Sequence, residues 1–119
     1  MSAFEVTIYH NPACGTSRDV LAMIRAAGIE PKIVEYLKTP PSRAELERLL
    51  ARAGLTIRDI LRKKAPPYGE LGLADPGVSD DAIFAAIAQH PVLIERPIVT
   101  SSKGVRLCRP KEKALEILP

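Results

Sequence analysis

The segment His10–Arg18, with the sequence HNPACGTSR, holds the residues best suited to chemistry, and Cys14 stands at its centre. It follows an apolar, β-forming run and precedes a helical pattern, which places the thiol at the start of a helix. Backbone N–H groups and the positive end of the helix dipole favour a thiolate there, and they can also hold an oxyanion beside the sulfur. The segment therefore predicts a nucleophilic cysteine next to an anion site. The alternative is an inert cysteine that packs as a small hydrophobic residue.

The residues after Cys14 exclude three rival motifs. Ser17 stands where a dithiol redox motif has its second cysteine, so disulfide cycling within this loop is not available. Val20 occupies the sixth position after the cysteine, where a tyrosine-phosphatase loop needs an arginine. The sequence also contains no glycine-rich Lys-Ser/Thr loop for nucleotides. What remains within this loop is a single thiol.

Three arginines are candidates for binding an oxyanion, namely Arg62, Arg96 and Arg109. Arg96 and Arg109 each precede a proline, which favours an extended backbone and limits where the side chain can point. The planar guanidinium group suits a tetrahedral oxyanion because it donates paired hydrogen bonds. The alternative is three solvated surface arginines, and Arg62 has the weaker support for a binding role.

The histidines and the second cysteine have less distinctive surroundings. His10 either orients the loop and tunes the thiol, or ends the preceding strand with its ring partly in solvent. His90 is interpreted as a histidine at a helix C-terminus, where it interacts with the dipole. Cys108 is interpreted as a packing residue, with a redox role as the alternative. The spacing of these residues matches no zinc site, and we expect no bound metal.

Hydrophobic periodicity and turn residues predict the elements that position these side chains. Strands are expected at Phe4–Tyr9, Lys32–Tyr36, Ile98–Thr100 and Val105–Cys108. Helices are expected from a Thr16 or Ser17 cap to Gly28, from Ser42 to Gly54, from Thr56 to about Lys63 and from Ser79 to His90. A last helix after Pro110 should bury Leu115 and Leu118, and Pro66–Gly69 is expected to form a turn.

This order of elements predicts an α/β, thioredoxin-like fold with a mixed sheet of about four strands. A β-α-β unit is followed by a helical insertion at about residues 40–95, a β-hairpin and a terminal helix. We expect residues 1–119 to form a single domain. In such a fold a cis proline stands beside the active cysteine, so the Arg96–Pro97 bond is expected to be cis. The hairpin ends that carry Arg96 and Arg109 should face the loop around Cys14, here called the thiol loop.

Composition favours a small anionic ligand over a polymer or a membrane. The chain has a formal net charge of +3, its basic residues are spread along it, and aromatic residues make up only 4%. A nucleic-acid surface would cluster its basic residues and interleave them with aromatic ones. No apolar run approaches the ~18 residues of a membrane span, and no signal-peptide pattern begins the chain. We therefore expect a cytoplasmic protein with reduced thiols and no nucleic-acid or membrane partner.

Four segments, taken together, resemble the glutaredoxin-dependent arsenate reductases. These are His10–Arg18, Leu61–Lys63, Glu95–Val99 and Arg106–Pro110. The resemblance runs from Tyr9 to the C-terminal Leu-Glu-Ile-Leu-Pro, and longer members of the family continue with a polar tail. The loop and the three arginines at this spacing are more specific together than any one motif.

The resemblance implies that Cys14 attacks arsenate to form a covalent adduct, while Arg62, Arg96 and Arg109 hold the oxyanion. It implies supporting roles around the thiolate for His10, Asn11, Ser17, Arg18 and Pro97. No cofactor would be bound; glutathione would attack the adduct as co-substrate, and glutaredoxin would resolve the mixed disulfide to give arsenite. The alternatives are a thioredoxin-like regulator and a generic glutathione-linked thiol redox protein without arsenate activity.

Overall fold

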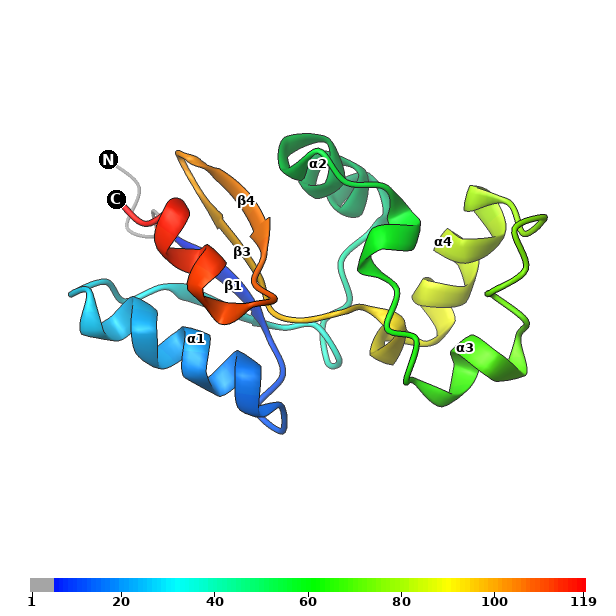
Figure 1. Cartoon of the computed structure of the whole chain (residues 1–119), viewed down its shortest axis with the longest axis horizontal. Helices are drawn as coiled ribbons and strands as arrows, with labels where there is room; N and C mark the ends of the chain where they lie inside the picture. Colours follow the sequence, from blue (N-terminus) through cyan, green and yellow to red (C-terminus); the bar gives the residue numbers. More distant parts are fainter. Residues whose placement is uncertain (1–5) are drawn as a thin grey trace. The chain divides into compact units, whose positions relative to one another are not determined.

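The computed structural model describes residues 6–119, which form two units (Figure 1). The first, here called the sheet unit, combines the chain up to Thr39 with Arg96–Pro119. The second, here called the helical unit, is Pro40–Glu95. That the two units form one domain stays a prediction.

The sheet unit contains a four-stranded mixed sheet in the order β2-β1-β3-β4. Strand β1 pairs in parallel with β2 and antiparallel with β3, and β3 and β4 form an antiparallel hairpin. The strands are β1 (Thr7–His10), β2 (Lys32–Glu35), β3 (Ile98–Ser101) and β4 (Gly104–Leu107). The predicted mixed sheet and hairpin are confirmed, while Phe4 of the first predicted strand lies outside the described residues.

Helix α1 (Gly15–Ala26) begins one residue after Cys14, which is itself the N-cap, so the predicted cap at Thr16 or Ser17 is wrong. The Cys14 N–H donates to the Asn11 carbonyl at 3.0 Å and thereby closes a turn. The Cys14 carbonyl in turn accepts from the Arg18 N–H at 3.0 Å, which is the first helical bond. The helix therefore starts early enough to point its first free N–H groups at the thiol.

The chain ends in the 3-10 helix η3 (Lys111–Glu116), which shares a core with α1 and one side of the sheet (Figure 1). The prediction that this helix buries Leu115 is wrong, because Leu115 is 58% exposed whereas Ala114 and Ile117 are buried. A 3-10 helix has about three residues per turn, so positions 114 and 117 share a face and 115 does not. The shared core consists of Val6, Ile8, Val20, Ile24, Val99, Cys108, Ala114, Ile117 and Leu118.

The helical unit contains α2 (Arg43–Ala53), η1 (Ile57–Ile60), α3 (Pro66–Glu70), α4 (Asp80–Gln89) and η2 (Pro91–Leu93). The predicted serine caps are confirmed: Ser42 accepts from the Glu45 N–H and Ser79 from the Ala82 N–H, each at 3.1 Å. The turn predicted at Pro66–Gly69 is wrong, because α3 begins there. Prolines fit the first turn of a helix, whose N–H groups need no helical partner.

The helix predicted to start at Thr56 is confirmed as η1, whose N-cap is Thr56, but its predicted end at about Lys63 is wrong, since η1 ends at Ile60. Leu61 forms an isolated bridge with Ile94, and the Arg62 N–H donates to the Leu93 carbonyl at 2.8 Å. These pairings require extended backbone, so the helix ends at Ile60 and the following backbone groups bond to residues 93 and 94 instead.

Candidate active site

Asn11 organises the loop between β1 and α1 through its own backbone and side chain. Its Oδ1 accepts from the Ala13 N–H at 3.0 Å, and its carbonyl accepts from the Cys14 N–H at 3.0 Å. Its N–H donates to the Ser17 Oγ at 3.1 Å. An asparagine side chain that bonds the backbone two residues on is a common turn device. The loop is therefore held closed from within, with Cys14 at the end of the turn.

His10 and Ser17 tie the end of β1 to the first turn of α1. The His10 Nδ1 lies 2.6 Å from the Ser17 Oγ, and both side chains are buried. Burial lowers the pKa of His10 below its usual value; Glu35 opposes this shift, while Arg25 and Arg18 reinforce it. When the neutral ring carries its proton on Nε2, the Ser17 hydroxyl donates this hydrogen bond to His10 Nδ1. The ring contacts the loop and is not partly in solvent.

Arg18 adds an outer brace to the same loop. Its Nη1 donates to the Pro12 carbonyl at 2.8 Å, although the side chain itself is exposed. Pro12 and Arg18 thus connect the turn before the thiol to the helix after it. His10, Asn11, Ser17 and Arg18 therefore all make contacts within the loop between β1 and α1.

The Cys14 thiol is 8% exposed, and its pKa is below the ordinary value. Burial is the largest single influence and raises the pKa. The Ser17 backbone N–H, the charge and hydrogen bond of Arg96 and the Thr16 backbone N–H outweigh it together. Each of these donors is satisfied better by a thiolate than by a thiol. The site therefore favours the ionised, nucleophilic sulfur.

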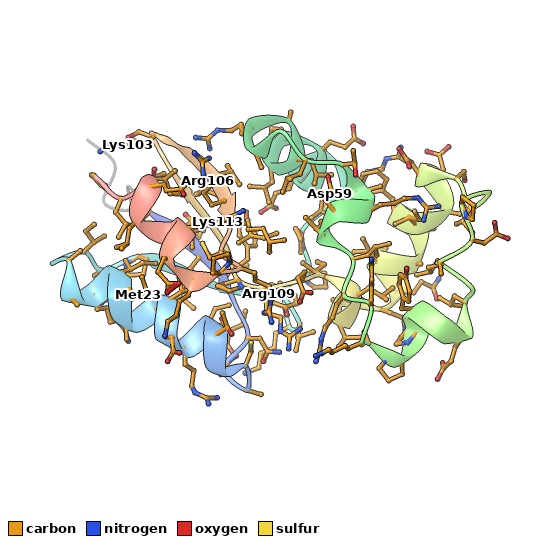
Figure 2. All side chains as sticks on the ribbon, in the orientation of Figure 1. Met23, Asp59, Lys103, Arg106, Arg109 and Lys113 are labelled. Atoms are coloured by element: carbon orange, nitrogen blue, oxygen red, sulfur yellow. The ribbon has the colours of Figure 1, made fainter. Side chains whose placement is uncertain are left out.

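Arg96 lies two residues before the start of β3, and its bond to Pro97 is cis, as predicted. The Arg109–Pro110 bond is also cis, which was not predicted. Arg96 is buried and hydrogen-bonds to the Cys14 sulfur, while the exposed Arg109 donates from Nη1 to the Arg96 carbonyl at 2.8 Å. The hairpin thus brings Arg96 to the thiol and links Arg109 to Arg96; Figure 2 labels Arg109 at this end of the hairpin.

Arg62 belongs to the helical unit, where the structure shows its backbone well anchored. Its N–H donates to the Leu93 carbonyl and its carbonyl accepts from the Ala65 N–H at 3.1 Å. The side chain is half-buried. A role for Arg62 in holding an oxyanion stays a prediction.

Two residues that influence the pKa values of Cys14 and His10 were not predicted from the sequence. The Thr16 backbone N–H lowers the Cys14 pKa, and the position of Thr16 in the first turn of α1 was available only once the helix start was known. Glu35 raises the His10 pKa because the parallel register places it opposite His10. Register between distant strands leaves no local signal in the sequence.

Within residues 6–119, no three His, Cys, Asp or Glu side chains come together in a group that could hold a metal ion. No helix in the same range combines the length and apolar character needed to cross a bilayer.

The mixed sheet, with a cysteine at the start of the first helix and a cis proline before the hairpin, defines a thioredoxin-like protein with a single-thiol site. The model of the ArsC family matches residues 9–117, and the chain belongs to that family.

Relatives and solved structures agree with this membership. Over 114 residues the chain is 63% identical to an arsenate reductase of Rhizobium meliloti (strain 1021) and 57% identical to one of Escherichia coli (strain K12). Each alignment covers 96% of this chain and 81% of the relative. The structure of an arsenate reductase from Vibrio cholerae superposes with a TM-score of 0.92 at 50% identity, covering 98% of this chain and all of that one (100%).

Proposed function

We propose that this protein reduces arsenate to arsenite, with Cys14 as the nucleophile. The observation that carries the proposal is the Cys14 thiol itself, which lies at the start of α1, contacts the buried Arg96 guanidinium and has a lowered pKa. Relatives that share more than half of the sequence are arsenate reductases.

In the first step the thiolate sulfur of Cys14 bonds to arsenic(V), and one arsenate oxygen leaves as water after protonation. Negative charge on the remaining oxygens needs fixed donors, and guanidinium groups supply them in pairs. We assign this role to Arg62, Arg96 and Arg109. Arg96 already lies at the sulfur, where an oxyanion bonded to Cys14 would be within its reach.

In the second step the glutathione thiolate attacks the Cys14 sulfur of the adduct, and the S–As bond breaks with its electron pair going to arsenic, which leaves as arsenite. The two sulfurs that supply the two electrons are joined in a Cys14–glutathione disulfide, which glutaredoxin then resolves. Support for an outside reductant comes from Ser17, which occupies the place of a second loop cysteine, and from the buried, protonated Cys108. A cytoplasmic setting, where glutathione keeps thiols reduced, suits this chemistry.

The test is arsenate-dependent NADPH oxidation coupled through glutathione, glutaredoxin and glutathione reductase. Wild type and Cys108→Ala should turn over, and Cys14→Ser should not. Turnover in Cys14→Ser equal to wild type would remove Cys14 from its role. Replacing glutaredoxin by thioredoxin and its reductase tests the reductant separately. Turnover with thioredoxin alone would overturn the glutaredoxin step and leave the nucleophile in place.

A further inference from the structure

The open end of the β3–β4 hairpin is held by two hydrogen bonds on neighbouring carbonyls. The Arg109 Nη1 donates to the Arg96 carbonyl at 2.8 Å. The Cys108 N–H donates to the next carbonyl, that of Pro97, at 2.9 Å. The backbone bond is an ordinary extension of the hairpin, but the bond from Arg109 is made by a side chain that the sequence marks only as an anion binder.

Arg109 holds the main-chain carbonyl of Arg96, and the side chain of Arg96 contacts Cys14. Arg96 is buried, and its guanidinium hydrogen-bonds to the sulfur. A hydrogen bond to a charged group weakens steeply when distance or angle changes, so the direction of the Arg96 main chain controls it. Within the described residues, Arg96 is the side chain that lowers the Cys14 pKa, and Arg109 contacts the Arg96 backbone.

We propose that Arg109 is a positioning residue for Arg96: its guanidinium holds the Arg96 carbonyl and so keeps the Arg96 side chain on the Cys14 sulfur before any oxyanion arrives. A guanidinium has five N–H donors in a fixed planar fork, so the bond from Nη1 to the Arg96 carbonyl also orients the rest of the Arg109 side chain. The inference deepens the proposed function and rests on it for its catalytic consequence.

The experiment measures the ionisation of Cys14 in the absence of arsenate. A failure of the positioning proposal can therefore be distinguished from a failure of the proposed reaction. The rate of Cys14 alkylation by iodoacetamide is followed against pH by peptide mass spectrometry. Arg109→Met should raise the pH midpoint by about 0.5 unit or more, which is roughly a threefold loss of thiolate below the midpoint. An unchanged midpoint would overturn the proposal.

A double-mutant cycle separates positioning from a direct effect of the Arg109 charge. Arg96→Met alone should raise the midpoint, and adding Arg109→Met to it should then change the midpoint by less than about 0.2 unit. An equal rise in both backgrounds would show that Arg109 acts on the sulfur by its own charge, and it would overturn the positioning role.

Arg106→Met is the matched control, because Arg106 lies in the same hairpin and pairs with Glu116 at 2.9 Å. In Figure 2, Arg106 and Arg109 lie at different levels of the segment from β4 to η3. Arg106→Met should leave the midpoint within about 0.2 unit of wild type. If Arg106→Met raised the midpoint as much as Arg109→Met does, the loss of one positive charge would explain both shifts, and the proposal would be contradicted. If Arg109→Met does not fold, Arg109→Gln is tested by the same profile.

Discussion

The two cysteines are both buried, Cys108 more deeply than Cys14, and their chemistry is opposite. Cys14 is 8% exposed and Cys108 is 0% exposed, and neither is in a disulfide within residues 6–119. Burial raises the pKa of Cys108 to about 12; Arg106 and Lys113 oppose that shift weakly, and Glu116 adds to it. At Cys14 burial acts in the same direction, yet the pKa is lowered.

The difference lies in the donors around each sulfur. Cys14 meets the N–H groups of a helix start and a buried guanidinium. Cys108 follows β4 and lies in the core between α1, η3 and the sheet, where its sulfur has the Arg106 carbonyl at 3.7 Å as a neighbour. A carbonyl oxygen stabilises the thiol and repels the thiolate. Burial alone therefore does not decide cysteine reactivity in this fold.

The largest expected effect is the difference in alkylation rate between the two cysteines of the native protein. Burial raises the pKa of Cys108 to about 12, whereas the pKa of Cys14 is lowered from its ordinary value. At pH 7 the Cys14 thiolate fraction should therefore be greater by orders of magnitude, on the order of a thousandfold. Iodoacetamide labelling read by peptide mass spectrometry measures the ratio, and similar rates would break the comparison.

Next in size is the effect of replacing Arg96 by lysine. Arg96→Lys keeps the charge and loses the planar fork, so kcat/KM for arsenate should fall by about 10- to 100-fold, in line with the loss of a hydrogen bond to a charged group. Arg106→Lys, which also keeps the charge but lies in the Glu116 pair, is the control and should match wild type. Steady-state kinetics in which both variants match wild type would contradict the role assigned to Arg96.

A smaller effect concerns acid and the His10–Ser17 contact that closes the thiol loop. The His10 pKa is lowered on folding, so the unfolded chain binds the proton more readily. This contribution to stability is fully present above the ordinary pKa of 6.5 and is lost as pH falls through the lower folded pKa. Wild type should lose up to about 1.4 kcal/mol per pH unit in that window relative to His10→Gln. Urea unfolding of both proteins between pH 7 and 5 measures it, and parallel pH curves would show that His10 titrates normally.

The smallest effect is expected from Cys108→Ala, which tests whether Cys108 is chemically inert. Removing one buried sulfur should cost about 1 kcal/mol of unfolding free energy without affecting the thiol loop. Denaturant unfolding gives the free energy, and the Cys14 alkylation profile gives the second readout. A shifted Cys14 profile would mean that the two sulfurs are coupled.

Features that depend on neighbours in the chain could be predicted from the sequence. The position of Cys14 between a strand and a helix, the serine caps of α2 and α4 and the hairpin all have local signals. Cap residues, alternation and turn residues act over a few residues, so their physics is complete in a short segment. That His10, Asn11 and Ser17 lie in the loop around Cys14 could therefore be predicted from the sequence.

Features that depend on contacts between distant segments were decided by the tertiary structure. Leu61 pairs with Ile94 where a longer helix was expected, and Ala114 of η3 and Ile117 at its C-cap are the buried residues of the terminal segment. The hydrogen bond from Arg109 to the Arg96 carbonyl joins residues 13 positions apart. Such partners are chosen by register and packing, which are settled only when the whole sheet assembles. The sequence determined by itself which groups could do chemistry, and tertiary structure decided which of them meet, because ionisation of a thiol depends on donors brought to it from other parts of the chain.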